Sequence, residues 1–406
     1  MENAEVLIDC HSVWKVFGER NAEAIEAITA QGLSKRDILR DFGCVVGVSD
    51  ASLQVHRGEI FCIMGLSGSG KSTLIRLLNR LIEPSLGTVL VKGQDISKMD
   101  AAALRRTRAE HIGMVFQSVA LLPQRNVLEN AAFGLEVQGI PRDERNRAAA
   151  DALAKVGLSD WTKHYPSELS GGMQQRVGLA RAMCTDPPIL LMDEAFSALD
   201  PLIRRQMQDE LLEIQEQVHK TILFITHDLN EALRLGNRVC ILRDGYVVQI
   251  GTPEEILTEP ANGYVAEFVQ DVDQGRVIDV ATVMGSVVVL DPDQTLASAL
   301  DAVGDRRGGF TIDADGRPVS LLAVSDAGIA LAHGTTALKD VLRTDFETTT
   351  AESRLNDNYA AAGRGMPIAV IDEAGRLVGE LEPREIMEEM GRVEQLIDGF
   401  EREGFL

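Results

Sequence analysis

The segment Gly65-Leu66-Ser67-Gly68-Ser69-Gly70-Lys71-Ser72-Thr73 joins a short apolar run, residues 58–64, to a helix-like stretch from Leu74 to Arg80. A buried strand that leads through glycines into a helix is typical of a phosphate-binding loop, and the segment fits the pattern G-x-x-x-x-G-K-[ST]. Glycines let backbone N–H groups close around an anion, and the helix N-terminus adds a favourable dipole. The alternative, a glycine-rich turn without a ligand, does not explain this strand–loop–helix order. The segment therefore predicts a nucleotide-binding α/β domain.

Two side chains of this loop have distinct expected roles. The Lys71 ammonium can reach the β- and γ-phosphates of a nucleotide, and the Ser72 hydroxyl can ligate Mg²⁺. The candidate nucleotide contacts in the loop are Gly65, Ser67, Gly68, Gly70, Lys71, Ser72 and Thr73.

A pair of carboxylates follows a second apolar run. Asp193 and Glu194 come directly after residues 189–192. An Asp at a strand end beside a phosphate loop can hold Mg²⁺, and an adjacent Glu can polarise the attacking water, which are roles that phosphoryl transfer needs. Taken alone, Asp-Glu after a strand is usually a solvated loop. Together with the phosphate loop, the pair predicts a metal ligand, Asp193, and a catalytic residue, Glu194.

Further apolar runs alternate with helix-like stretches. Residues 221–226 predict a third buried strand, and residues 101–160 have a helical period with breaks at Pro123 and Pro141. A strand–turn–strand over residues 239–250 closes this half of the chain. Strands that alternate with helices predict a central, mostly parallel sheet.

A second glycine-rich segment is Leu169-Ser170-Gly171-Gly172-Met173-Gln174-Gln175-Arg176. A hydroxyl and two glycines at a helix start form another anion-binding N-terminus. An ordinary helix cap would explain a bare Ser-Gly-Gly, but the full eight-residue string is too specific for that reading. The chain therefore contains two candidate phosphate-binding loops.

With this segment the chain resembles the ATP-binding subunits of ABC transporters over about residues 6–270. In that family, loops of the LSGGQ type act in trans, so that each completes the ATP site of a partner subunit. The resemblance implies a homodimer that closes on two molecules of ATP with Mg²⁺. In it, Ser170, Gly171 and Gly172 contact the nucleotide of the opposite copy. Met173 stands where many relatives have glutamine, a departure that several importer branches share.

Four further motifs of the family follow in order. Phe17 matches the aromatic residue that stacks on adenine, with Trp14 as a rival and a core phenylalanine as the alternative. Gln117 matches the glutamine loop, which touches Mg²⁺ or water and faces the membrane subunit. Asp200, in Ser197-Ala198-Leu199-Asp200, matches the D-loop that crosses the dimer, and His227 matches the switch histidine near the γ-phosphate. The resemblance thus implies a catalytic set of Glu194, His227 and Gln117 and a metal set of Ser72, Gln117 and Asp193.

An insertion at about residues 19–45 narrows the family. Residues 19–43 are expected to be helical, with Ser34 and Asp37 as a capping box and Gly43 as the end. Together with residues 63–67 and 78–84, the insertion resembles the glycine betaine/proline importer ATPases. The resemblance implies a peripheral protein at the cytoplasmic face of the cell membrane, with permease subunits as partners and a substrate-binding protein as an indirect one. Importers of choline or amino acids, and a soluble ABC ATPase without a transport role, are the alternatives.

Composition and charge set outer limits on these functions. The chain has 406 residues and a formal net charge of −22, which argues against nucleic acid as a partner. No stretch approaches the roughly 18 uninterrupted apolar residues of a membrane span, and the acidic N-terminus is unlike a secretory signal. The cysteines Cys10, Cys44, Cys62, Cys184 and Cys240 form no CxxC pair, so reduced thiols are expected.

The chain changes character near residue 271. Beyond it there are 26 acidic and 12 basic residues, against 36 and 28 before it. We therefore expect an ABC ATPase domain at residues 1–270 and a second domain at 271–406. The second contains a weak repeat at a spacing of 59 residues, 311–317 and 370–376, each of which predicts a strand, a D-x-x-G-R turn, a strand and a helix. Two unrelated hairpins with the same turn chemistry are the alternative.

The family resemblance implies that this tail is an α+β tandem CBS-like regulatory domain. In CBS pairs an Asp or Thr after the last strand often holds a ribose; residues 324–326 partly fit this pattern and residues 383–385 do not. The acidic tail should also be repelled by an anionic lipid surface. A regulatory role and a dimer-stabilising role are therefore both open.

Overall fold

The computed structural model describes residues 5–117, 119–197, 199–270, 272–389 and 391. The chain divides into two compact units, residues 1–256 and 257–406, and the division falls in α11 (Pro253–Thr258). The domain limits expected at residues 270 and 271 stay a prediction.

Unit 1 is built on a six-stranded sheet in the order β10-β9-β3-β8-β7-β6. Its central strands β3 (Ile60–Met64), β8 (Thr221–Ile225) and β7 (Ile189–Asp193) are parallel and buried at every position. Because parallel strands end at the same edge, the loops after these three strands meet there. The α/β fold with a central, mostly parallel sheet is therefore confirmed. The flanking strands are β6 (Ile112–Val115), β9 (Arg238–Arg243) and the antiparallel β10 (Tyr246–Gly251).

A second, antiparallel sheet has the order β2-β1-β4-β5. It shares one apolar core with the first sheet and with α3 (Lys71–Leu78): Val89 of β4, Phe61 of β3 and Leu74 of α3 are completely buried in it. This core fixes α3, and with it the start of the phosphate loop's helix. The strands are β1 (Val6–Phe17), β2 (Val45–His56), β4 (Leu86–Val91) and β5 (Gln94–Asp95).

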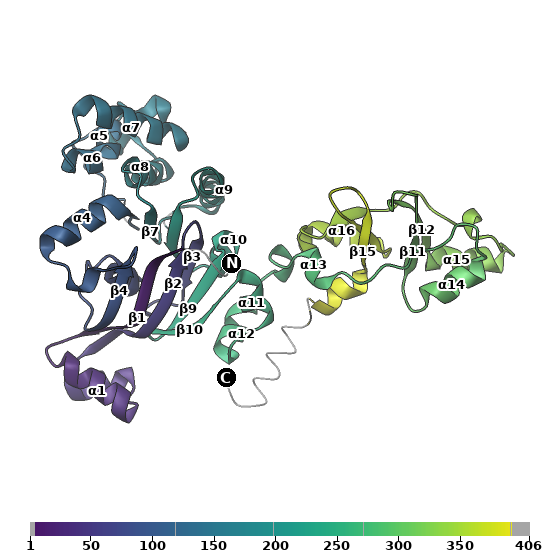
Figure 1. Cartoon of the computed structure of the whole chain (residues 1–406), viewed down its shortest axis with the longest axis horizontal. Helices are drawn as coiled ribbons and strands as arrows, with labels where there is room; N and C mark the ends of the chain where they lie inside the picture. The colour runs from purple at the N-terminus through teal and green to yellow at the C-terminus, as the bar shows by residue number, and fades with distance from the viewer. Residues whose placement is uncertain (1–4, 118, 198, 271, 390, 392–406) are drawn as a thin grey trace. The chain divides into compact units, whose positions relative to one another are not determined.

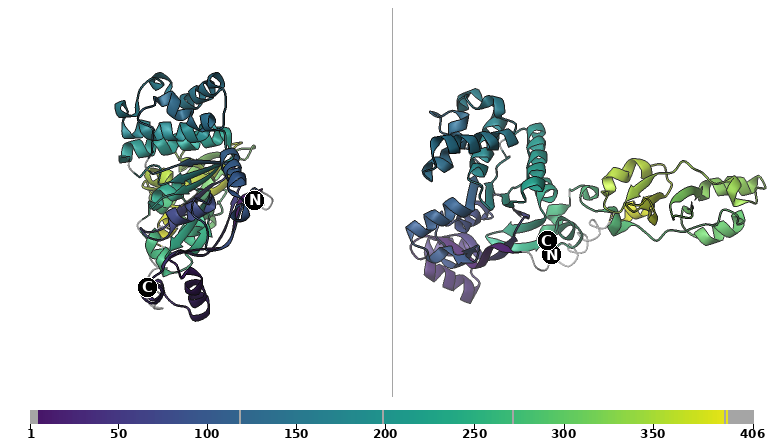
Figure 2. Two further views of the ribbon diagram at one scale, coloured as in Figure 1. Left: turned by 90° about the vertical axis from the view of Figure 1, so that its left-hand side faces the viewer. Right: turned by 45° about the horizontal axis from the view of Figure 1, so that its top comes forward.

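A group of helices lies on one side of unit 1 in all three ribbon views (Figures 1 and 2). It contains α5 (Val127–Ala131), α6 (Phe133–Val137), α7 (Arg142–Lys155) and α8 (Gly171–Cys184). The helical expectation for residues 101–160 is wrong in one place, because β6 follows α4 (Ala101–His111). This strand has four residues, too few for its alternation to stand out between helices, and it is held by its pairing with β7.

The insertion forms two helices, α1 (Asn21–Gln31) and α2 (Lys35–Phe42). The predicted capping box is confirmed: Asp37 N donates to Ser34 Oγ at 3.2 Å, and Ser34 N donates to Asp37 Oδ2 at 3.2 Å. Gly43 ends α2 in the left-handed conformation, as expected. Gly32 ends α1 in the same way and so divides the expected helical stretch in two.

Further helices occur along the chain. Three of them are α9 (Pro201–Val218), α10 (Leu229–Leu235) and α12 (Gly263–Val269). Short 3₁₀ helices lie at Ile96–Lys98, Ser159–Trp161, Pro166–Glu168, Gln274–Arg276, Leu338–Asp340 and Leu355–Asn358. Among the described residues, every helix is too short or too polar to cross a membrane. All five cysteines are free and buried, in agreement with the expected reduced thiols, and burial raises the pKa of the Cys184 thiol to about 11.

Unit 2 contains two copies of one structural unit, which confirms the predicted repeat. In the first hairpin Phe310 pairs with Leu321, and 59 residues later Ala369 pairs with Glu380 in the second. A shared register of this kind is not expected of two unrelated hairpins. The first copy contains α14 (Leu296–Val303), β11 (Gly308–Ile312), β12 (Pro318–Ala323) and α15 (Val324–Ala332). The second contains β13 (Thr348–Thr350), α16 (Tyr359–Ala362), β14 (Ile368–Ile371), β15 (Leu377–Leu381) and helical residues 383–389.

The two copies interlock. The segment before the second copy pairs with the first through Arg343 and Leu321, and the segment after α13 (Val280–Val283) pairs with the second through Gly285 and Glu380. Phe310 and Leu321 of the first copy also share a small apolar core with Ala369 of the second. Neither copy is therefore complete without the other.

One buried carboxylate breaks the similarity of the copies. Glu380 occupies the position of Leu321, is fully buried, and forms an ion pair with Arg306 of the first copy. Its Oε2 atom has no hydrogen-bond partner. Burial raises the pKa of Glu380, and the charges of Glu382 and Glu385 act in the same direction against the lowering by Arg306.

This carboxylate predicts a pH dependence of stability. Because its pKa is raised in the fold, the folded chain binds the proton more tightly than the unfolded chain, so stability falls as pH rises above the ordinary value of 4.5. Between pH 4.5 and the raised pKa of Glu380 in the fold, we expect the free energy of unfolding of the wild type to fall relative to that of Glu380→Gln. The slope should be at most about 1.4 kcal/mol per pH unit. Pulse-labelled hydrogen exchange of β15 peptides across a urea series measures it. The exposed Glu373→Gln is the control, and a pH-independent difference would contradict the prediction.

Candidate nucleotide site

The phosphate loop lies between β3 and α3, and two of its glycines, Gly65 and Gly70, have no room for a side chain. Gly65 has φ +149°, and a Cβ there would lie 2.2 Å from Leu242 O. Lys71 is 5% exposed, and its Nζ donates to Gly65 O at 2.7 Å and to Leu66 O at 3.1 Å. Burial lowers the pKa of Lys71, while the nearby Glu194 and Asp193 raise it. The ammonium is thus held over the loop, where it can meet an anion.

The two candidate metal ligands lie side by side. Ser72 Oγ donates to Asp193 Oδ1 at 3.2 Å, although the residues are 121 positions apart in the chain. Burial raises the pKa of Asp193, opposed mainly by this hydrogen bond and by the charge of Arg76. A hydroxyl and a carboxylate form an oxygen donor pair of the kind Mg²⁺ prefers. In the described part of the chain no group of three or more His, Cys, Asp or Glu side chains is arranged to hold a metal. An ion at Ser72 and Asp193 would therefore need phosphate or water oxygens as well.

Two of the three candidate catalytic residues, Gln117 and His227, converge on one carboxylate oxygen of the third, Glu194. Gln117 Nε2 donates to Glu194 Oε2 at 3.1 Å, and His227 Nδ1 lies 3.5 Å from the same oxygen. They follow β6, β7 and β8, three neighbouring strands of the sheet. Glu194 has φ +47°, a left-handed conformation that is costly for a glutamate. The bond from Glu194 N to Ile225 O at 3.1 Å helps to hold it there. The structure therefore brings the predicted catalytic set together.

The two aromatic candidates for adenine stacking differ in exposure. Trp14 is 5% exposed and packs in the core under α1 and α2, whereas Phe17, at the end of β1, is 40% exposed. A Cβ on Gly47 would lie 2.9 Å from the Phe17 ring and 3.2 Å from Thr73 Cγ2, so Phe17 lies beside the start of α3. Phe17 remains the candidate because its ring is partly exposed beside the phosphate loop, with the Lys15 ammonium 5.1 Å from the ring centroid.

The second glycine-rich segment is placed apart from these residues. Ser170 caps α8, its Oγ accepting from Met173 N at 3.3 Å, and both Ser170 and Gly171 are exposed. Within the described ranges, no hydrogen bond or ion pair joins Ser170, Gly171 or Gly172 to the phosphate loop. Asp200 caps α9 through Leu202 N and Ile203 N. Ala198 of the same motif lies outside the described residues.

Sequence reasoning missed a pair of backbone hydrogen bonds by which Gly245 connects the phosphate loop to Ser49 of β2. Gly245 N donates to Ser69 O at 2.8 Å, and Gly245 O accepts from Ser49 N at 2.8 Å. Residues 243–245 were expected to form only the turn between β9 and β10. The pair Asp244-Gly245 indicates such a turn in the sequence. The contact of Gly245 with the distant phosphate loop has no sequence pattern that would indicate it.

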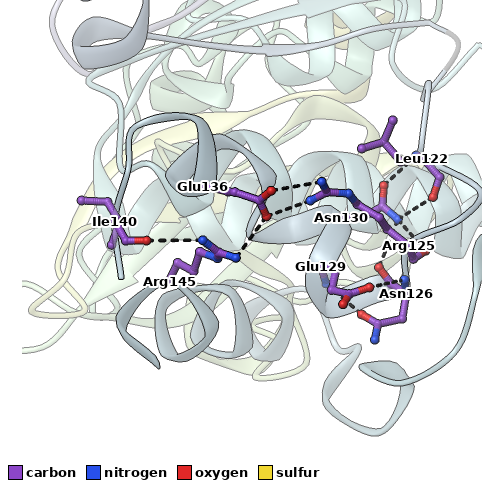
Figure 3. Close-up of polar contacts among 8 residues, drawn as sticks. All are labelled: Leu122, Arg125, Asn126, Glu129, Asn130, Glu136, Ile140 and Arg145. Atoms are coloured by element: carbon purple, nitrogen blue, oxygen red, sulfur yellow. Dashed lines mark hydrogen bonds and ion pairs between the residues drawn. The ribbon is translucent and has the colours of Figure 1, made fainter. Parts of the chain in front are cut away.

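A polar cluster follows the glutamine loop (Figure 3). Asn130 is fully buried; its side chain donates to the carbonyls of Leu122, Arg125 and Asn126 and accepts from Leu122 N. Glu136 accepts two bonds from Arg125, at 2.8 and 3.0 Å, and is paired with Arg145 at 3.2 Å. The hydrogen bond and charge of Arg125 hold the pKa of Glu136 below its usual range. The cluster borders a hollow of about 390 Å³, lined by Gln124, Arg125, Glu129, Glu136, Arg142 and Arg145.

The fold and the site define an ABC-type ATPase. The family model described as ABC transporter matches residues 48–197. A solved dimeric structure of an ATP-binding cassette, in a post-hydrolysis state with ADP and Pi, matches with a TM-score of 0.51 and 29% identity. That match covers 61% of this chain and 99% of the other.

Similarity to curated proteins extends over nearly the whole chain. The glycine betaine transport ATP-binding protein OpuAA of Bacillus subtilis is 46% identical over 93% of this chain and 91% of its own length. The glycine betaine/proline betaine transport system ATP-binding protein ProV of Salmonella typhimurium is 45% identical over 95% and 98%. The chain therefore belongs to the ABC transporter family of glycine betaine and proline betaine transport ATP-binding proteins. It is an ATPase whose hydrolysis of ATP is coupled to import.

Proposed function

We propose that this protein energises the uptake of glycine betaine or proline betaine, and that the solute itself never contacts this chain. The proposal is supported by the names of the relatives and by their coverage, which includes the tail as well as the ATPase unit. The observation that carries the ATPase part is the convergence of Gln117 and His227 on Glu194, next to Ser72 and Asp193.

The residues have the following proposed roles in hydrolysis. Backbone N–H groups of residues 65–73 and the Lys71 ammonium bind the β- and γ-phosphates, and Phe17 stacks on adenine. Ser72, Asp193 and Gln117 would hold Mg²⁺, which neutralises charge on the phosphates.

Glu194 accepts a proton from the attacking water as the water oxygen bonds to the γ-phosphorus. The bond to the β,γ-bridging oxygen breaks, and ADP leaves with that electron pair. His227, whose Nδ1 atom lies 3.5 Å from Glu194 Oε2, would contact the γ-phosphate.

We further propose that the site is completed by a second copy of the chain. The N-terminus of α8 is exposed and is not bonded to the phosphate loop of its own chain, so Ser170, Gly171 and Gly172 are available to a nucleotide held by another copy. The dimeric cassette among the solved relatives supports this arrangement. Asp200 and the D-loop would lie at the same seam.

The membrane partners are proposed from family membership and from the site. Permease subunits would contact the loop after Gln117, which leads into the charged hollow bordered by Arg125, Glu136 and Arg145. This arrangement implies a peripheral location at the cytoplasmic face of the cell membrane, with a substrate-binding protein on the other side as an indirect partner.

For residues 271–406 we propose a tandem CBS-like regulatory domain. Its support is the repeated unit with a common register and the interlocking of the two copies through Arg343 and Gly285.

Transport measured in vesicles tests the proposed solute. We expect ATP hydrolysis by the full chain, reconstituted with its permease subunits and binding protein, to rise when glycine betaine is added outside. Labelled glycine betaine should accumulate in parallel. Choline and proline serve as competing solutes, and complexes with Glu194→Gln give the background. Stimulation by choline or an amino acid alone would reject the solute while leaving the ATPase role intact.

A further inference from the structure

A single arginine connects the two loops that flank Glu194. Arg204, in the first turns of α9, donates from Nη2 to Ser197 O at 3.2 Å and to Leu199 O at 3.1 Å. Both carbonyls belong to the D-loop. Its Nη1 atom lies 3.6 Å from Asp228 Oδ2, and Asp228 directly follows His227. The guanidinium therefore contacts the D-loop and the switch loop at once.

Both loops are fixed to Glu194 on their other side. Ser197 Oγ donates to Glu194 O at 3.0 Å, and His227 Nδ1 lies 3.5 Å from Glu194 Oε2. A shift of the D-loop carbonyls thus acts on Arg204 and on the Glu194 backbone together. Through Asp228 it also reaches His227.

The helices behind these loops are joined by a buried network, and they lie near each other in Figure 1. Glu231 of α10 is 5% exposed and accepts from Thr226 Oγ1 and, at 2.9 Å, from Gln208 Nε2 of α9. Arg234 donates to Gln208 Oε1 at 2.9 Å. Since α9 and α10 are held together in this way, the contacts of Arg204 can change with little movement of the helices themselves.

Arg204 lies in the first turns of α9, where a positive charge does not stabilise a helix. A cation near a helix N-terminus is opposed by the helix dipole, and the first turn of α9 contains no acidic residue. Its Nε atom is buried without a hydrogen-bond partner. The charge is compensated by Asp228 and the two carbonyls, so the arginine fits a linking role better than a helix-stabilising one.

We propose that Arg204 is a positioning residue that couples the D-loop to His227, so that closure of the seam sets the hydrolytic geometry around Glu194. This inference rests on the proposed function, because it assigns the D-loop to the seam between two copies. Asp228 is the second half of the link: its Oδ1 caps α10, accepting from Asn230 N at 3.0 Å, which leaves Oδ2 for Arg204.

Kinetics of the full-length ATPase test the link. We expect Arg204→Gln to lower kcat for ATP hydrolysis by about tenfold to a hundredfold, because small displacements at a reacting centre have effects of that size. The dissociation constant for ATP and the melting temperature should stay close to wild type. Arg204→Lys, which keeps the charge but cannot serve both carbonyls and Asp228, should fall between. The exposed neighbour Arg205→Gln is the matched control and should behave as wild type.

A double-mutant cycle separates positioning from general destabilisation. Asp228→Asn removes the charge and keeps an oxygen to cap α10. If Arg204 acts through Asp228, the double variant should be no slower than the slower single variant. The link would be overturned if the fold losses in kcat of the two single variants multiplied in the double variant. It would also be overturned if Arg204→Gln hydrolysed ATP at the same rate as Arg205→Gln. If Arg204→Gln fails to fold, Arg204→Lys and Asp228→Asn give the same comparison. Full activity of Glu194→Gln would instead reject the proposed catalytic site, so the two failures are distinguishable.

Discussion

Replacing Glu194 with glutamine is expected to lower kcat for ATP hydrolysis by about 10²–10⁴-fold, the range that a positioned general base contributes. The new amide has the shape of the carboxylate and can still accept from Gln117 Nε2, which bonds Glu194 Oε2 at 3.1 Å. It cannot accept the proton of the attacking water. ATP should therefore bind and remain intact, and the closed dimer should accumulate. Phosphate release and size-exclusion chromatography with ATP measure the two effects.

A carboxylate on the same unit but away from the site gives the control. Glu216 is exposed on α9, and Glu216→Gln should hydrolyse ATP at the wild-type rate and elute as a monomer after turnover. Unchanged turnover of Glu194→Gln would show that another group takes the proton. A slow variant that never dimerises with ATP would argue against the shared site while leaving the role of Glu194 intact.

The central residues of the site were predictable because their placement is local. Lys71 and Ser72 follow a buried strand through a glycine loop, and Asp193 and Glu194 end another. A strand of a parallel sheet delivers the residue after it to the common edge, so the order of the motifs in the chain already fixed their meeting point. The rule places Ser72 and Asp193 at one edge although they are 121 positions apart, and the structure shows the hydrogen bond that joins them there.

The choice between Trp14 and Phe17 could not be made from alternation. Residues on a regular strand alternate between faces, but β1 has register shifts after Val13 and after Lys15. Each irregularity changes which face the next side chain takes. Only the fold shows that the Trp14 side chain points into the core and that the Phe17 ring stays partly exposed.

Contacts between distant segments were also beyond the sequence. Glu380 reads as one residue of an ordinary strand, yet its partner Arg306 lies 74 positions earlier. Arg204 lies in a polar stretch of the chain, and its partners lie on two loops. Burial of a charge depends on the partner that compensates it, and no local pattern encodes that partner.

The phosphate loop gives the other large effect that we expect. Gly70 has φ +105°, and a Cβ there would lie 2.3 Å from Gly47 O, a backbone atom of β2. Gly70→Ala therefore meets both a left-handed conformation, which costs roughly 1–2 kcal/mol, and a clash that a flexible side chain cannot relieve. The loop must move away from β2, and its backbone N–H groups then no longer point at the phosphate oxygens. We expect ATP affinity, measured by titration calorimetry, to fall by more than a hundredfold, since a bound phosphate depends on several of these groups.

Gly68 separates the two causes. It is also left-handed, with φ +80°, but a Cβ there would have no heavy atom within 4 Å. Gly68→Ala meets the conformational cost alone, so its ATP affinity should fall by at most about tenfold, the equivalent of roughly 1.4 kcal/mol. Equal losses in the two variants would mean that backbone conformation, and not the contact with β2, fixes the loop. A larger loss for Gly68→Ala would mean that the loop binds phosphate in a shape different from the one seen here. Because both glycines lie in the same loop and receive the same methyl group, the ratio of the two affinities isolates what the antiparallel sheet contributes to nucleotide binding.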